Sequence, residues 1–196
     1  MLFRSHTKFT QGKGTITISP GVYCNGIDFG SKAVVHMNPG TYYIDKGNFN
    51  VNAQATVDCN CSASGSGVTI VLTSSAADHS GIGTVTINGG ANIALTAPAD
   101  TGYSYPGVLF FQDRNAGTTD TNKFNGGADM DLGGAIYFPQ QLIEWSGDTG
   151  VRSPSCTQII ARLITFIGNN NTIINDSGCA SGGGKRINTT VIGLIE

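Results

Sequence analysis

Apolar and polar residues alternate along much of the chain, and the alternation recurs. Four segments, IDFGSKAVVHM, FNVNAQATVDC, VTINGGANIAL and NKFNGGADMDL, align on an alanine: Ala33, Ala55, Ala91 and Ala128. In each copy the residues four before, two after and four after the alanine are apolar, and those between are polar or small. This period of two predicts a strand with one buried face. The glycine and asparagine residues just before the alanine predict a bend or bulge within it.

A second motif alternates with the first. It is a glycine followed by four or five apolar or β-branched residues, as in PGVYC, PGTYYI, SGVTIVL, PGVLFF and GGAIYF, and it begins at Gly21, Gly40, Gly67, Gly107 and Gly134. CTQIIA and NTTVIGLI are weaker copies. The two motifs alternate about seven times without an intervening helical pattern, which indicates coils stacked along one axis.

The repeats predict an all-β fold, a right-handed parallel β-helix of about seven coils with two strands per coil. Right-handedness is expected because parallel crossovers are almost always right-handed. We interpret residues 1–13 as an N-terminal remnant or lead-in segment and residues 14–196 as a single β-helix domain.

The glycine-led strands are apolar at successive positions, a pattern typical of strands covered on both faces. A stack of coils buries one face only, so the second face requires a cover. The aromatic loop 97–106, an upstream domain or another protein could supply it, and an uncovered patch would mark an interaction surface. The candidate residues for this interaction face are Tyr23, Tyr42, Leu109 and Ile136.

The charge of the chain is low and slightly acidic. Of 196 residues 12% are charged, the net charge is −2, and 28 are glycine. A chain without a basic patch is a poor partner for nucleic acid or an anionic membrane surface. The sequence also has no apolar run long enough to span a bilayer.

Five cysteines occur at positions 24, 59, 61, 156 and 179. Their spacing fits no zinc pattern, and the three histidines are scattered. We therefore predict no metal and no cofactor. Two alternatives remain open: disulfides formed in an oxidising compartment, with Cys156 and Cys179 as the first candidate pair, or five reduced thiols.

Two groups of charged residues are candidates for chemistry. Asp113 and Arg114 follow the VLFF strand, close to where an earlier copy has Asp45 and Lys46. The repetition favours a structural role at a corner, where an Asp side chain accepts backbone hydrogen bonds.

Asp129 and Asp131 lie on the polar face of the alanine motif, in columns that also hold Asp58 and His36. Two carboxylates fall short of the six to eight oxygens that Ca²⁺ prefers. A solvated outer face is the favoured interpretation.

The segments GVLFFQDR and GAIYFPQQ, together with PGVYCNGI, NPGTYYI, GVTIVLT, GANIALTAP and CTQIIARLITF, resemble the C-terminal part of TadG-like proteins. The resemblance covers residues 16–196. It implies a secreted or envelope-anchored bacterial module of Flp/Tad pilus-assembly systems, exposed outside the inner membrane and associated with tight adherence. It supplies no catalytic residues.

The expected function is a non-catalytic, extracytoplasmic structural or adhesion module. Its expected partners are envelope or pilus-assembly proteins or a surface glycan. The alternative is a polysaccharide lyase or hydrolase on the same fold, with Asp113, Arg114, Asp129 and Asp131 as its catalytic candidates. A third hypothesis, ice binding, needs a flat threonine array, and only Thr15/Thr17 and Thr84/Thr86 form clean pairs.

Overall fold

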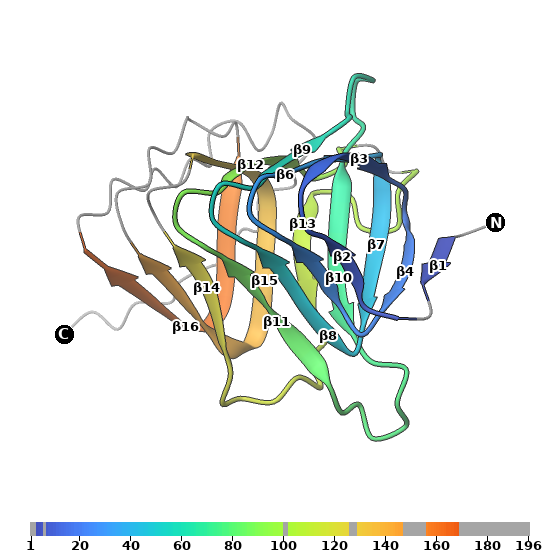
Figure 1. Cartoon of the computed structure of the whole chain (residues 1–196). Helices are drawn as coiled ribbons and strands as arrows, with labels where there is room; N and C mark the ends of the chain where they lie inside the picture. The colour runs from blue at the N-terminus through green and yellow to red at the C-terminus, as the bar shows by residue number, and fades with distance from the viewer. Residues whose placement is uncertain (1–2, 6, 100–101, 126–128, 147–155, 169–196) are drawn as a thin grey trace.

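The computed structural model describes residues 3–5, 7–99, 102–125, 129–146 and 156–168, and these residues form strands and turns without a helix. All strand pairs are parallel. The chain winds repeatedly through three stacks of strands that surround a common core (Figure 1). The all-β, parallel solenoid-like architecture expected from the repeats is therefore confirmed. Within the described part of the chain, no helix is long and apolar enough to cross a membrane.

The first stack contains the five glycine-led strands together with β1 and part of β16. Its members are β1 (Phe3–Ser5), β4 (Gly21–Cys24), β7 (Gly40–Asp45), β10 (Val68–Thr73), β13 (Val108–Gln112), the middle of β15 (Asp129–Ser146) and the first half of β16 (Thr157–Ile167). The second stack contains β2 (Phe9–Gln11), β5 (Ile27–Phe29), β8 (Gly47–Val51), β11 (Ile82–Ile87), β14 (Thr121–Asn125) and the last parts of β15 and β16. The third stack contains β3 (Gly14–Ile18), β6 (Ala33–Met37), β9 (Thr56–Cys59), β12 (Asn92–Thr96) and the start of β15.

Each coil through these stacks has three strands, so the expectation of two strands per coil is wrong. The alanine-centred motif spans a corner and contributes one strand to the second stack and one to the third. At the corner the N–H of Ala33 donates to the carbonyl of Gly30 at 3.1 Å. The residue before the alanine has a positive φ, 67° at Lys32 and 65° at Gln54. At this left-handed residue the chain turns from the second stack into the third, which makes the predicted bend a complete corner.

The column alignment of the alanine motif is confirmed by the strand register. Val35 pairs with Val57, which pairs with Ile93, which pairs with Met130. The glycine-based alignment of the first stack is confirmed for Gly67, Gly107 and Gly134, since Ile70 pairs with Phe110 and Val108 with Ala135. It is off by one or two positions in the earlier copies, because Gly40 pairs with Val68 and Gly21 pairs with Tyr42. A strand that is apolar at every position gives no period from which to set its register.

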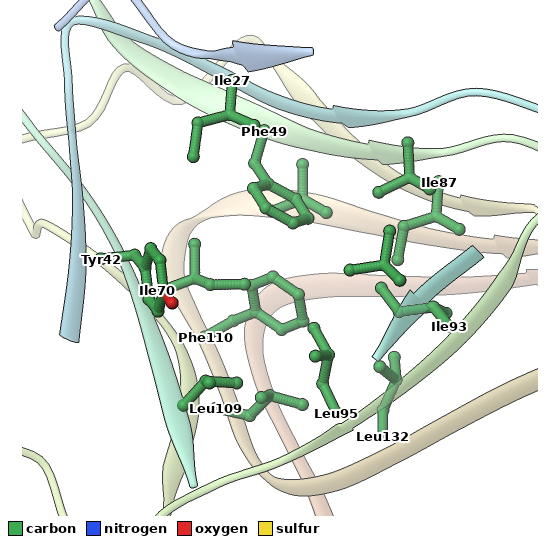
Figure 2. Packing of buried hydrophobic residues seen from close by; sticks show 14 of the residues in the cluster. Ile27, Tyr42, Phe49, Ile70, Ile87, Ile93, Leu95, Leu109, Phe110 and Leu132 are labelled. Carbon is green, nitrogen blue, oxygen red and sulfur yellow. The ribbon is translucent and has the colours of Figure 1, made fainter. Parts of the chain in front are cut away.

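The core is formed by alternate residues of all three stacks. Figure 2 shows Tyr42 and Phe110 of the first stack, Phe49 of the second and Ile93 and Leu132 of the third among the buried residues of this cluster. Aromatic rings contact one another through the core, with Phe110 5.9 Å from Phe124 and 6.0 Å from Phe49. These contacts join rings of the first and second stacks across the core.

The four candidate interaction residues are part of this core, so that assignment is wrong. Tyr23, Tyr42, Leu109 and Ile136 are all at most 1% exposed. The two tyrosine rings stack at 5.8 Å, and their hydroxyls donate to corner carbonyls, Tyr23 to Ser19 at 2.7 Å and Tyr42 to Asn38 at 2.8 Å. Burial raises the pKa of Tyr23 to about 12 and also raises the pKa of Tyr42. These hydroxyls let tyrosine occupy an interior position without an unpaired polar atom.

Candidate functional site

Asp113 lies at the corner that directly follows β13. Its Oδ1 accepts hydrogen bonds from the backbone N–H and the side-chain amide of Asn115, both at 3.0 Å, and its Oδ2 accepts one from the Thr73 hydroxyl at 3.1 Å. Burial acts to raise the pKa of this carboxyl, but these hydrogen bonds outweigh it and lower the pKa. The arrangement stabilises the ionised side chain within a turn.

The same column holds a second corner carboxylate, as the sequence predicted. Asp45 pairs with Thr73, and Asp113 directly follows the pairing of Leu72 with Gln112. Asp45 is 5% exposed and accepts hydrogen bonds from the backbone N–H and hydroxyl of Ser75 at 2.7 and 2.8 Å. Acidic residues at this edge of the first stack therefore hold the loops that follow the strands.

Arg114 lies against an aromatic ring of the next coil. Its Nε donates to the Tyr137 hydroxyl at 3.0 Å, and the guanidinium carbon is 5.8 Å from the centre of the Tyr137 ring. This contact combines a hydrogen bond with a cation–π interaction. Asp113 and Arg114 thus have separate structural partners.

The outward side of the first stack carries a ladder of apolar and aromatic side chains, which we call the first-face ladder. The strand register aligns its members in order as Val22, Tyr43, Val71, Phe111 and Tyr137. The rings of Phe111 and Tyr137 stack at 5.4 Å with an interplanar angle of 18°. Val22, Tyr43, Phe111 and Tyr137 are each adjacent in the sequence to a buried residue of the same strand and lie on its opposite side. The buried residues are Tyr23, Tyr42, Phe110 and Ile136.

The loop before β13 covers part of the first-face ladder. The Tyr105 ring lies 5.6 Å from the Phe111 ring. Burial raises the pKa of Tyr105, and Tyr43 adds to the shift. Val71 is only 3% exposed, whereas Tyr43, Phe111 and Tyr137 stay half-buried. The aromatic loop therefore covers the centre of the ladder and leaves its aromatic edges accessible.

A hollow of about 240 Å³ lies beside the ladder at the end of the strands. Val22, Tyr43, Asp45, Thr73, Ser74 and Ser75 line it. It combines an apolar wall with a carboxylate and three hydroxyl groups.

The outer side of the third stack carries the other candidate carboxylates. The register aligns Thr17, His36, Asp58, Ala94 and Asp131 in one row. Nδ1 of His36 is 2.6 Å from Oδ1 of Asp58, and the two side chains are 37% and 36% exposed.

A shallow hollow of about 310 Å³ follows Asp58 along this row, over the small side chain of Ala94. Its polar groups come from Thr56, Asp58, Asn92 and Asp131. Asp129 pairs with Asn92 through its backbone, and its side chain lies outside the described residues. Among the residues that the structure describes, no group of three or more acidic, histidine or cysteine side chains is placed to hold a metal ion.

The threonine pairs considered for ice binding do not continue into neighbouring strands. Thr15 and Thr17 align with Val34 and His36, and Thr86 aligns with Asn50 and Lys123. No flat threonine array is built at these positions.

The cysteines are partly paired. Cys59 and Cys61 form a disulfide, whereas the first candidate pair from the sequence was Cys156 and Cys179. Cys156 is disulfide-bonded, and Cys24 is a free thiol. Cys179 lies outside the described residues, so its pairing with Cys156 stays a prediction.

Sequence reasoning recognised the first-face strands but selected the wrong side chains. The functional candidates that it missed are Tyr43, Phe111, Tyr137 and Tyr105. The positions of the acidic corner residues in the sequence could have identified these side chains. Asp45 and Asp113 end their strands in one column, so counting back two residues from each gives Tyr43 and Phe111, which share a face.

Comparison with known proteins adds no relationship: no family model, curated protein or solved structure matches this chain.

Proposed function

We propose that this chain is a right-handed parallel β-helix of about seven coils that serves as a non-catalytic, extracytoplasmic adhesion module. The number of coils follows from the alternation of the two sequence motifs, and the handedness from the general preference of parallel crossovers. Its partners in this role are envelope or pilus-assembly proteins or a surface glycan.

The observation that carries the proposal is the first-face ladder. A row of half-buried aromatic side chains is held at fixed spacing by parallel strands and braced by Tyr105 and Arg114. Aromatic side chains with few rotatable bonds supply contact area at low entropic cost, which suits a binding surface. Asp113, the leading catalytic candidate, has its oxygens engaged in a corner instead.

An extracytoplasmic location is supported by two observations. Disulfides such as Cys59–Cys61 persist mainly in oxidising compartments. The resemblance of GVLFFQDR and GAIYFPQQ to TadG-like proteins implies the same location and a link to tight adherence.

The experiment that tests the proposal measures attachment of the purified, labelled chain to bacterial cells and to polysaccharide-coated surfaces. The double variant Phe111→Ser/Tyr137→Ser removes the two half-buried aromatic rings at one end of the ladder, and we expect it to bind at least about tenfold more weakly. The double variant His36→Ser/Asp58→Ser alters a pair on the third face and serves as the control. Equal attachment by wild type and ladder variant would contradict the proposal.

A second candidate function is glycan cleavage at the third face. The observation that favours it is the 2.6 Å contact between His36 and Asp58 beside the hollow lined by Asp131. An Asp that accepts from Nδ1 leaves Nε2 of the histidine as a base. Release of oligosaccharides from a polysaccharide panel, abolished in His36→Ala and in Asp131→Asn, is the result that would establish it.

A further inference from the structure

We propose that the hollow beside Tyr43 and Asp45 binds one sugar ring of a glycan. This inference rests on the proposed adhesion function and names the ligand class of one site on the first face. The hollow measures about 240 Å³. Pockets for drug-sized ligands occupy roughly 300–1,000 Å³, so this one suits a single ring.

Asp45 supplies a preorganised acceptor. Its carboxylate is 5% exposed, and hydrogen bonds from Ser75 hold both oxygens, while the Cys24 sulfur lies 4.0 Å from Oδ2. An ionised carboxylate offers about four acceptor positions. Oδ1 receives one of these hydrogen bonds, at 2.7 Å, and has capacity for a hydroxyl of a ligand.

The other polar groups of the hollow also present acceptors. The Thr73 hydroxyl donates its hydrogen to Asp113, and the Ser74 hydroxyl donates to the carbonyl of Ser80 at 2.6 Å. With these hydrogens committed, the Thr73 oxygen can only accept from a ligand. A lining rich in acceptors favours a ligand rich in hydroxyl donors.

The apolar wall favours a ring over a small ion. Val22 and Tyr43 are register neighbours on the outward face, and both side chains are half-buried. A sugar presents C–H groups on one face and hydroxyls at its rim, which matches an aromatic wall beside a carboxylate. Because Ser75 already holds the Asp45 carboxylate in place, little ordering of that group accompanies binding.

The test is a ligand-detected NMR titration of the full chain with glucose, galactose, mannose and N-acetylglucosamine. We expect saturation transfer to at least one of these sugars. Val22→Phe fills the hollow from a half-exposed outward position, and Asp45→Asn removes the charge, so each is expected to weaken binding at least about tenfold. Val34→Phe makes the same change at a half-exposed valine of the third stack and is the matched control, expected to bind as the wild type does.

Circular dichroism and thermal melting of each variant show whether it is folded, and only folded variants enter the comparison. Absence of transfer to all four sugars would overturn the inference, as would binding that a folded Val22→Phe leaves unchanged. Transfer to N-acetyl-lysine amide in place of the sugars would also overturn it, in favour of a cationic partner. If none of the sugars binds while attachment still depends on Phe111 and Tyr137, only the sugar site is contradicted. If the sugars bind while the chain does not attach to cells or polysaccharide, the adhesion function is contradicted.

Discussion

At the scale of single residues, the acidic side chains of the first stack act as corner supports. Asp45 ends β7 and Asp113 directly follows β13, with β10 between the two strands. Each accepts a backbone N–H two or more residues beyond a strand end. A carboxylate in this position accepts hydrogen bonds from backbone N–H groups that have no partner within the sheet where the chain turns away from it. The acid–base pair formed by Asp113 and Arg114 in the sequence is divided in the structure, since Arg114 packs on Tyr137.

Replacing Asp113 by Ala is expected to lower the free energy of unfolding by about 1–2 kcal/mol, because three hydrogen bonds to a partly exposed carboxylate are lost. Urea unfolding at neutral pH measures the change. Asp113→Asn, which keeps one acceptor oxygen, is expected to fall between Ala and wild type. An unfolding curve of Asp113→Ala that overlays the wild-type curve would contradict the corner role.

The contribution of Asp113 to stability is expected to depend on pH. The pKa of Asp113 is lowered in the folded chain, and the pKa of Asp in an unfolded chain is about 3.9. The unfolded state therefore binds more protons in this range, and stability falls as the pH falls. The difference in unfolding free energy between wild type and Asp113→Asn should be constant above about pH 5 and shrink as the pH drops through the folded pKa. A difference that grows on acidification is the opposite result.

At the scale of elements, the corners determine where each strand begins. Asparagines at equivalent corner positions form a ladder, in which Asn88 donates to Asn52 at 3.1 Å and Asn52 donates to Asp28 at 2.8 Å. The alanine-motif alignment placed these asparagines in one column, so the sequence predicted their position. The corner was expected only as a bend within one strand, because the buried residues Val51, Ala55 and Val57 keep the period of two across it.

Close backbone approach at one corner gives a test at this scale. A Cβ at Gly83 would overlap the carbonyl oxygen of Gly47 and the side-chain oxygen of Asn48. Gly83→Ala must therefore shift the backbone of β8 or β11 and is expected to cost about 1–3 kcal/mol in unfolding free energy.

Gly117→Ala is the matched control, because a Cβ there meets no atom within 4 Å. It is expected to be neutral or to stabilise the chain by up to about 1 kcal/mol. Thermal or urea unfolding of both variants makes the comparison. Similar stabilities for the two variants would show that the second stack is not packed as described.

At the scale of the whole molecule, the repeats predicted the parallel stacking and the shared core columns, since Val35, Val57, Ile93 and Met130 align as expected. The residues expected on the outward side of the first stack were misassigned because the glycine-led strands are apolar on both sides. Composition cannot distinguish Tyr42, fully buried, from Tyr43, half-buried, when both are tyrosines in one strand. The strand β7 begins at Gly40, and the chain direction there places Tyr42 on the inward side and Tyr43 on the outward side.

The central claim is that the chain binds through its first face and does not cleave what it binds. The most direct measurement incubates the chain with soluble polysaccharides and determines both the retained polymer and its chain length by size-exclusion chromatography. We predict retention of polymer at unchanged length, with retention lost in Phe111→Ser/Tyr137→Ser and kept in His36→Ser/Asp58→Ser. Shortening of a polymer by the wild type that disappears in His36→Ser/Asp58→Ser would contradict the claim.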